Sequence, residues 1–215
     1  MKAVKINLYS DTQSLPTPAM REAMASAEVG DEQHRLDPSV SKLCHEVAEL
    51  LGKEDALFLP SGTMCNQISL AVHCGAGDEI IADQSAHIIN YEAGGPAVLS
   101  RSLVRALDGD CGIFDAEDVQ KAIRSNSYHA PRSRLVVVEQ TSNRGGGAVW
   151  PLSTLQGVAT VAREHGLNLH MDGARLMNAV VASGVPAAEF AATVDSLWLD
   201  LSKGLGCPVG AELAG

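Results

Sequence analysis

The run 135–138, Leu-Val-Val-Val, constrains the fold more than any other feature of the sequence. A short uninterrupted apolar run is typical of a strand that is buried on both faces of a parallel sheet. Similar runs alternate with segments of helical periodicity, and this alternation predicts an α/β domain with a mostly parallel central sheet. The expected strands are 56–59, 78–83, 135–138, 167–171 and 196–201, and the expected helices are 39–51, 64–73, 116–124 and 154–165, with 179–182 extending a further helix.

The charge and cysteine content exclude several classes of protein. A net charge of −10 argues against a nucleic-acid groove or an anionic membrane surface as the main partner. The five cysteines are odd in number and contain no C-x-x-C pair, so we expect neither a disulfide framework nor a metal site. The N-terminus carries no secretory signal and no apolar stretch is long enough to span a membrane, so a cytoplasmic location is expected.

Three polar segments each follow an expected strand. These are the Ser-Gly-Thr segment 61–63, Asp172 and Lys203. In open α/β sheets, ligands collect at the carboxyl ends of the strands. The three segments are therefore expected to meet at one edge of the sheet.

Lys203 is the most informative of these residues. It comes directly after an expected strand and before the three glycines 204, 206 and 210, where the backbone can approach a ligand closely. A desolvated lysine near a cationic group loses its proton and becomes a nucleophile toward a carbonyl. A surface lysine at a strand exit is the alternative interpretation.

Asp172 and Arg175 belong to the segment Asp-Gly-Ala-Arg at 172–175. An aspartate at a strand end can pair with the pyridinium nitrogen of pyridoxal 5′-phosphate (PLP) and so preserve its capacity to accept electrons. Arg175 can reach an anionic oxygen of a cofactor or substrate. For the tetrapeptide alone, an aspartate that caps the following helix is equally plausible.

The remaining candidates carry weaker patterns. Gly62 and Thr63 open an expected helix, whose N–H groups would form an anion site for a phosphate, although Ser-Gly-Thr is also an ordinary helix start. His87 is suited to stack on a cofactor ring or to take a proton from a substrate. His129 is a similar candidate with less local support.

Seven segments resemble the low-specificity L-threonine aldolases. This family belongs to the β-eliminating lyase group of aspartate-aminotransferase-like (fold type I) PLP enzymes. The segments follow the family's order along the whole chain: YSDT (9–12), LPTPAMREAM (15–24), PSGTMCNQI (60–68), YEAGG (91–95), NRGGG (143–147), DGARLMNA (172–179) and LSKGLGCPVG (201–210).

The resemblance implies that residues 1–215 form a PLP-binding large domain. It also implies retro-aldol cleavage of L-threonine or L-allo-threonine to glycine and acetaldehyde, through a Lys203 aldimine and a quinonoid. Gly62 and Thr63 would hold the phosphate, and Asp172 would pair with the ring nitrogen. A homodimer or homotetramer with sites shared between subunits is expected.

The resemblance assigns the substrate contacts to a second group of residues. Ser10 and Arg175 match positions that hold the substrate carboxylate. His87 would stack on the ring, and His87 and His129 match the two histidines that handle the β-hydroxyl proton.

Three departures from the family pattern leave alternatives open. His34, Arg35 and Leu36 replace a tyrosine, a glycine and a glutamate, and Ser142 replaces a histidine. The chain also stops at Gly215, where family members continue into a small C-terminal domain. A catalytically silent PLP-binding remnant and a PLP lyase that acts on other β-hydroxy amino acids are the alternatives.

Overall fold

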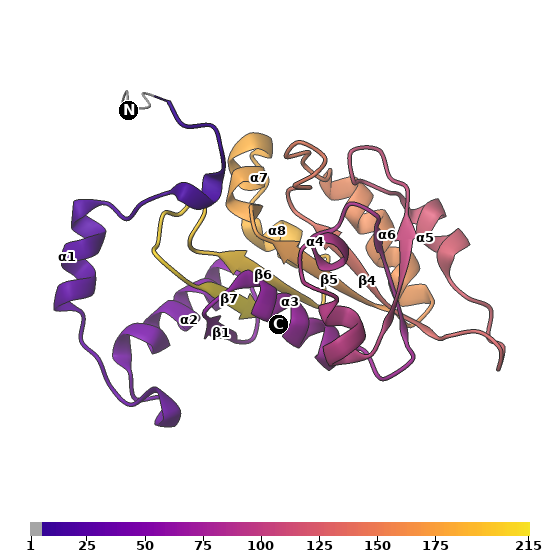
Figure 1. Ribbon diagram of the computed structural model, residues 1–215, viewed down its shortest axis with the longest axis horizontal. Helices are drawn as coiled ribbons and strands as arrows, with labels where there is room; N and C mark the ends of the chain where they lie inside the picture. Colours follow the sequence, from indigo (N-terminus) through magenta and orange to yellow (C-terminus); the bar gives the residue numbers. More distant parts are fainter. Residues whose placement is uncertain (1–5) are drawn as a thin grey trace.

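The computed structural model describes residues 6–215 and contains a seven-stranded sheet (Figure 1). The spatial order is β1-β7-β6-β5-β4-β2-β3. Strands β3, β2, β4, β5 and β6 are parallel, whereas β7 is antiparallel to both of its neighbours, β6 and β1. The predicted α/β fold with a mostly parallel sheet is therefore confirmed. The strands are β1 (Ala56–Leu59), β2 (Glu79–Asp83), β3 (Leu103–Leu107), β4 (Ser133–Glu139), β5 (Asn168–Gly173), β6 (Ser196–Asp200) and β7 (Ala211–Ala214).

Helices cover both faces of the sheet (Figure 1). On one face, helix α3 packs over β1, β7, β6, β5 and β4, and on the other face α2, α5, α6, α7 and α8 share one large core. The α-helices are α1 (Pro18–Ser26), α2 (Pro38–Leu51), α3 (Gly62–His73), α4 (His87–Asn90), α5 (Ala116–Ala122), α6 (Leu152–Glu164), α7 (Leu176–Ser183) and α8 (Ala187–Ala191); η1 (Asp11–Gln13) and η2 (Glu32–His34) are 3-10 helices and η3 (Pro96–Ser100) is a π-helix.

Strand β4 shows why the Leu-Val-Val-Val run constrains the fold. Val136 and Val138 pack into the core that α6 covers, while Leu135 and Val137 pack into the core under α3. All four side chains are at most 2% exposed. The strand is buried on both faces, as its uninterrupted apolar character predicts.

Helix α2 begins and ends at residues suited to those positions. The Asp37 carboxylate accepts hydrogen bonds from the Ser39 and Val40 backbone N–H groups, and Pro38 occupies the first turn. Gly52 ends the helix in the left-handed conformation, with φ 62°. The apolar stripe between these caps places Val47 and Leu51 in the core.

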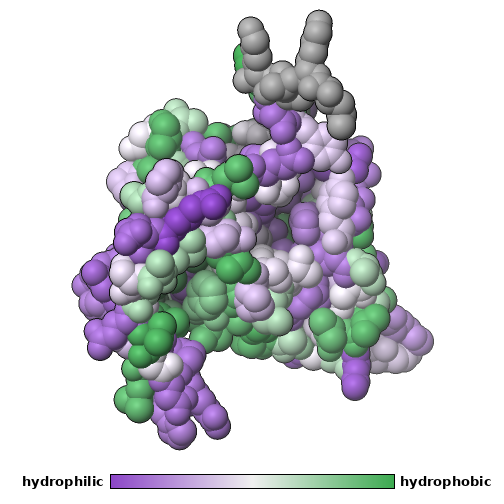
Figure 2. All heavy atoms as spheres, turned by 60° about the vertical axis from the view of Figure 1, so that its left-hand side comes forward, coloured by the Kyte–Doolittle hydropathy of each residue, from purple (hydrophilic) through white to green (hydrophobic). Residues whose placement is uncertain are grey.

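The N-terminal segment extends away from the sheet and its helices (Figure 1). Helix α1 buries none of its residues, and Leu8, Tyr9 and Val29 are exposed. Figure 2, in which this side of the molecule comes forward, shows apolar residues gathered between hydrophilic ones over this face. Within residues 6–215, no helix is both long and apolar enough to cross a membrane.

Candidate active site

A cavity of about 440 Å³ opens at the edge of the sheet where β4, β5 and β6 end. Residues far apart in the sequence line it together, because parallel strands deliver their carboxyl ends to the same edge. Seven of the eight predicted site residues line this cavity: Ser10, Gly62, Thr63, His87, Asp172, Arg175 and Lys203.

Lys203 lies just beyond β6, with its amine inside the cavity region and its side chain 16% exposed. Its Nζ donates a hydrogen bond to Asp200 Oδ2 at 2.6 Å and lies 5.4 Å from the centre of the Trp198 ring. The other oxygen of Asp200 accepts from the backbone and hydroxyl of Ser202. The lysine therefore has a carboxylate partner, Asp200, which the sequence reasoning missed.

Asp172 is held at the end of β5 with 3% of its surface exposed. Its Oδ2 accepts from Asn66 Nδ2 at 2.9 Å and its Oδ1 accepts from the Ala174 backbone at 3.1 Å. Burial raises the pKa of Asp172, and the hydrogen bond from Asn66 and the charge of His87 partly offset this effect. Two fixed donors thus orient a buried carboxylate at the cavity.

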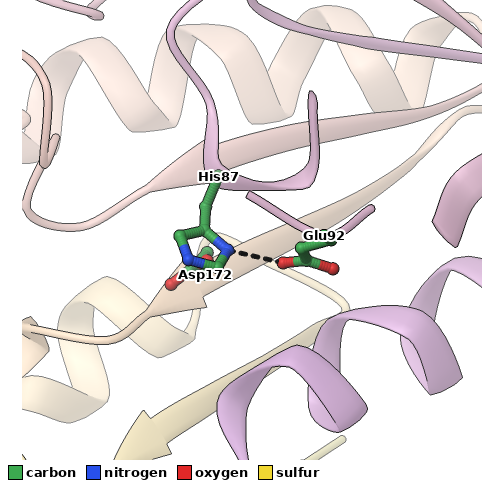
Figure 3. A group of neighbouring side chains, drawn as sticks. All are labelled: His87, Glu92 and Asp172. Atoms are coloured by element: carbon green, nitrogen blue, oxygen red, sulfur yellow. Dashed lines mark hydrogen bonds and ion pairs between the residues drawn. The ribbon is translucent and has the colours of Figure 1, made fainter. Parts of the chain in front are cut away.

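His87 lies beside Asp172 and is bonded to a second buried carboxylate, Glu92 (Figure 3). Because a carboxylate only accepts, His87 Nδ1 carries a proton and donates it to Glu92 Oε1 at 2.7 Å. This hydrogen bond raises the pKa of His87, whereas burial by itself would lower it. The ligand-type atoms of these three residues all lie within 4.8 Å of one another, and their existing hydrogen bonds account for that closeness.

The N-terminus of α3 forms another wall of the cavity. Ser61 caps the helix by accepting from the Met64 backbone N–H at 3.3 Å, which leaves the N–H groups of Gly62 and Thr63 at the open end. A Cβ on Gly62 would lie 2.1 Å from the Trp198 ring, so packing against this ring requires a glycine. The wall offers donors and a helix dipole to an anion.

Arg175 and Ser10 both line the cavity, and Arg175 binds the N-terminal segment that contains Ser10. The Arg175 guanidinium forms a two-point ion pair with the carboxylate of Asp11, with Nη2 to Oδ1 at 2.9 Å. This pair lowers the pKa of Asp11. Ser10 caps η1 with its hydroxyl and lines the cavity from the same segment.

His129 is the one predicted residue that the described chain does not bring to the cavity. It is exposed in the loop before β4. Because β4 runs from this loop toward the cavity, His129 lies at the end of the strand away from the cavity. Its ring lies against Tyr128, with centroids 3.9 Å apart. Its role in catalysis stays a prediction.

Sequence reasoning missed four polar residues that the structure places at or behind the cavity: Asn66, Glu92, Glu139 and Asp200. Two of them, Glu139 and Asp200, are the last residues of β4 and β6. Their position at the carboxyl end of an apolar run was therefore a usable signal. Burial, together with the neighbouring Asp172, raises the pKa of Glu139. Asn66 and Glu92 carry no such signal, because each comes from a helix or loop whose burial depends on tertiary packing.

The groups around the cavity fit the chemistry of PLP. An amine at Lys203 suits an aldehyde, the buried carboxylate of Asp172 suits a ring nitrogen, and the N-terminus of α3 suits a phosphate. The imidazole of His87 suits the face of an aromatic ring. The cavity volume is also in the ordinary range of small-molecule sites.

Comparisons with known proteins give similar sequences over nearly the whole chain. The family model described as β-eliminating lyase matches residues 7–215. Low-specificity L-threonine aldolase 1 of Arabidopsis thaliana is 42% identical over 214 residues, which are 98% of this chain and 60% of the relative. The low specificity L-threonine aldolase of Escherichia coli K12 is 43% identical over 211 residues, which are 98% of this chain and 62% of that protein.

Solved structures have the same fold. A threonine aldolase of Leishmania major superposes with a TM-score of 0.84 at 25% identity, over 95% of this chain and 60% of that chain. A structure of SPT with PLP superposes with a TM-score of 0.67 at 18% identity, over 91% of this chain and 47% of that chain, which shows the shared fold alone. The chain spans about 60% of the length of the curated relatives named above.

Proposed function

Because this chain belongs to the β-eliminating lyase family, we propose that it is the PLP-binding large domain of a threonine aldolase. The proposed reaction cleaves L-threonine or L-allo-threonine to glycine and acetaldehyde. The names of the similar proteins support this substrate class. The proposal covers the activity of the whole protein, of which this chain matches about 60% of the length in its relatives.

The observation that carries the proposal is the meeting of Lys203, Asp172 and the N-terminus of α3 on one cavity. Lys203 would bind the aldehyde carbon of the cofactor, Asp172 its ring nitrogen, and Gly62 and Thr63 its phosphate. When bound, PLP supplies the acceptor for the electron pair that the breaking Cα–Cβ bond releases.

His87 would handle the proton of the β-hydroxyl group. Its Nδ1–H is committed to Glu92, so Nε2 is the nitrogen that accepts a proton. Removing the hydroxyl proton turns the Cβ–O bond into the carbonyl of acetaldehyde while Cα–Cβ breaks. Glycine forms when Cα gains a proton, so the atoms of threonine are fully accounted for.

Arg175 and Ser10 would hold the substrate carboxylate. Arg175 is already paired with Asp11, so a substrate carboxylate would share or replace that partner. A guanidinium suits this task because it binds a carboxylate at two points.

The cofactor assignment is tested by absorbance. Purified protein mixed with PLP should develop a visible band of lysine-bound cofactor, and the band should be absent from Lys203→Ala. Lys53→Ala is the matched control, because the Lys53 amine is also partly buried but bonds the Val194 carbonyl away from the cavity. An unchanged band in Lys203→Ala contradicts the proposed role of this lysine.

The reaction is tested by assaying the aldehyde product, which is acetaldehyde from threonine or allo-threonine and benzaldehyde from phenylserine. Turnover of the first two supports a threonine aldolase. Turnover of phenylserine alone would indicate a lyase for other β-hydroxy amino acids, and binding of PLP without turnover would indicate a silent domain. Light scattering on the same protein tests the homodimer or homotetramer and its predicted shared sites.

A further inference from the structure

A row of buried and half-buried polar side chains connects Asp172 to the opposite edge of the sheet. On the face covered by α3, hydrogen bonds join Asn168 Nδ2 to His73 Nδ1 (2.9 Å), His73 Nε2 to Ser196 Oγ (2.7 Å) and Ser196 Oγ to His170 Nδ1 (2.8 Å). His170 Nε2 then contacts Asn66 Oδ1 at 3.2 Å. We call these five residues the Asn66 chain.

The orientation of the Asn66 amide is settled by its neighbours. Trp198 Nε1–H can only donate, and it lies 2.8 Å from Oδ1, so this atom must be the amide oxygen. Nδ2 lies 2.7 Å from Glu92 Oε1 and 2.9 Å from Asp172 Oδ2, so its two N–H groups serve these two carboxylates. The reversed amide would bring two N–H donors together at Trp198.

This orientation fixes the direction of every other bond in the Asn66 chain. His170 Nε2 must carry a proton, because it faces an amide oxygen. Burial lowers the pKa of His170 to about 3, so the ring is neutral and its bare Nδ1 accepts from the Ser196 hydroxyl. The Ser196 oxygen then accepts from His73 Nε2–H, and burial keeps His73 neutral in the same way by lowering its pKa.

We infer that Asn66 is a positioning residue, held by a one-way line of hydrogen bonds from His73 so that its two N–H groups aim at Asp172 and Glu92. Bonds that run in one direction polarise one another, which strengthens the final donors. Asn66 has none of its surface exposed and contacts both carboxylates, so it couples Asp172 to the Glu92–His87 pair across the cavity.

The direction of the bonds does not depend on the proposed function, whereas the effect of Asn66 on a cofactor rests on it. The first experiment therefore uses cofactor-free protein labelled with ¹⁵N at its seven histidines and assigned by single His→Gln variants. NMR should show His170 and His73 as neutral rings with the proton on Nε2. A His170 ring protonated on Nδ1, either alone or together with Nε2, would overturn the inference.

The second experiment interrupts the Asn66 chain at a distance from the cavity. Ser196→Ala removes the donor to His170 Nδ1, so the ¹⁵N resonance of Nδ1 should shift while the proton stays on Nε2, and Ser196→Thr should restore the original resonance. Ser69→Ala is the matched control, since Ser69 is a buried serine whose hydroxyl bonds only the Cys65 carbonyl of its own helix. A purely structural role would lower the unfolding temperature and leave the His170 Nδ1 resonance unchanged, which would contradict the inference.

The third experiment removes the donors themselves. Asn66→Asp keeps an oxygen for Trp198 and His170 but replaces the N–H groups that serve Asp172 and Glu92. These N–H groups bond buried carboxylates and so contribute more than ordinary hydrogen bonds, and PLP binding should weaken about tenfold or more without them. Equal PLP affinity in Asn66→Asp and in the original protein would refute the positioning role, while failure of both to bind would count against the proposed function alone.

Discussion

Glu212 destabilises this fold at neutral pH, and replacing it by leucine should stabilise the protein. The residue lies in β7 between Phe58 of β1 and Leu199 of β6, with none of its surface exposed. Among residues 6–215, neither of its carboxylate oxygens has a hydrogen-bond partner. The thiol of Cys44 on α2 approaches Glu212 as a weak donor and lowers its pKa, but burial raises the pKa by more.

The magnitude follows from the pKa. Burial raises the pKa of Glu212 from 4.5 to about 7. The folded protein therefore holds this proton more tightly than the unfolded chain, and stability falls as pH rises from about 4.5 to 7. With 1.36 kcal/mol for each pKa unit, the full loss above pH 7 is about 3 kcal/mol, and at pH 5 it is about 1 kcal/mol.

Urea unfolding at pH 5 and pH 8 measures this loss. Glu212→Leu should raise the free energy of unfolding by about 2 kcal/mol more at pH 8 than at pH 5, because about 1 kcal/mol of the loss is already present at pH 5. Glu212→Gln should remove the same pH dependence while leaving a buried polar group. Glu164→Gln is the control, because Glu164 is exposed on α6. An equal pH dependence in Glu212→Leu and the original protein would refute this account.

Three further predictions concern the site and its surroundings. Gly62→Ala should lower the free energy of unfolding by roughly 1–3 kcal/mol in urea, since its Cβ would lie 2.1 Å from the indole ring beneath it. Glu92→Gln should lower the pKa of His87 in an NMR titration, because the carboxylate is the main cause that raises it, and an unchanged pKa would contradict this. Arg124→Ala should lower the unfolding temperature, because the buried carboxylate of Glu79, 3% exposed, loses the guanidinium that binds it at two points. An unchanged unfolding temperature would show that water replaces the guanidinium.

Most of the strands that could be predicted have an apolar character that reports burial on both faces, whereas β1 has Leu57 exposed. Strands β1, β2, β4, β5 and β6 all lie within one or two residues of their expected positions. Strand β3 was missed because it is an edge strand with Arg105 at its centre and an exposed Leu103. Strand β7 was missed because Ala-Glu-Leu-Ala has no strand pattern of its own, and its pairing comes from long-range contacts with β1 and β6.

The site could be predicted where residues follow buried strands, and it could not where helices and loops supply the partners. Asp172 and Lys203 were found from their positions after apolar runs. Asn66 was not, because the middle of an amphipathic helix places polar residues on its exposed face by default. Only the packing of α3 against β5 and β6 shows that this asparagine faces two carboxylates.

The antiparallel strand β7 determines when β1 can join the sheet during folding. Strand β1 has no sheet neighbour among the described residues except β7, and residue 56 pairs with residue 214. Strand β1 leaves the ribosome well before β7 and must therefore wait for β7 before it joins the sheet. Closing so long a loop is slow relative to local pairing, so β2 to β6 are expected to assemble first, with β7 completing the sheet and capturing β1 in one late step.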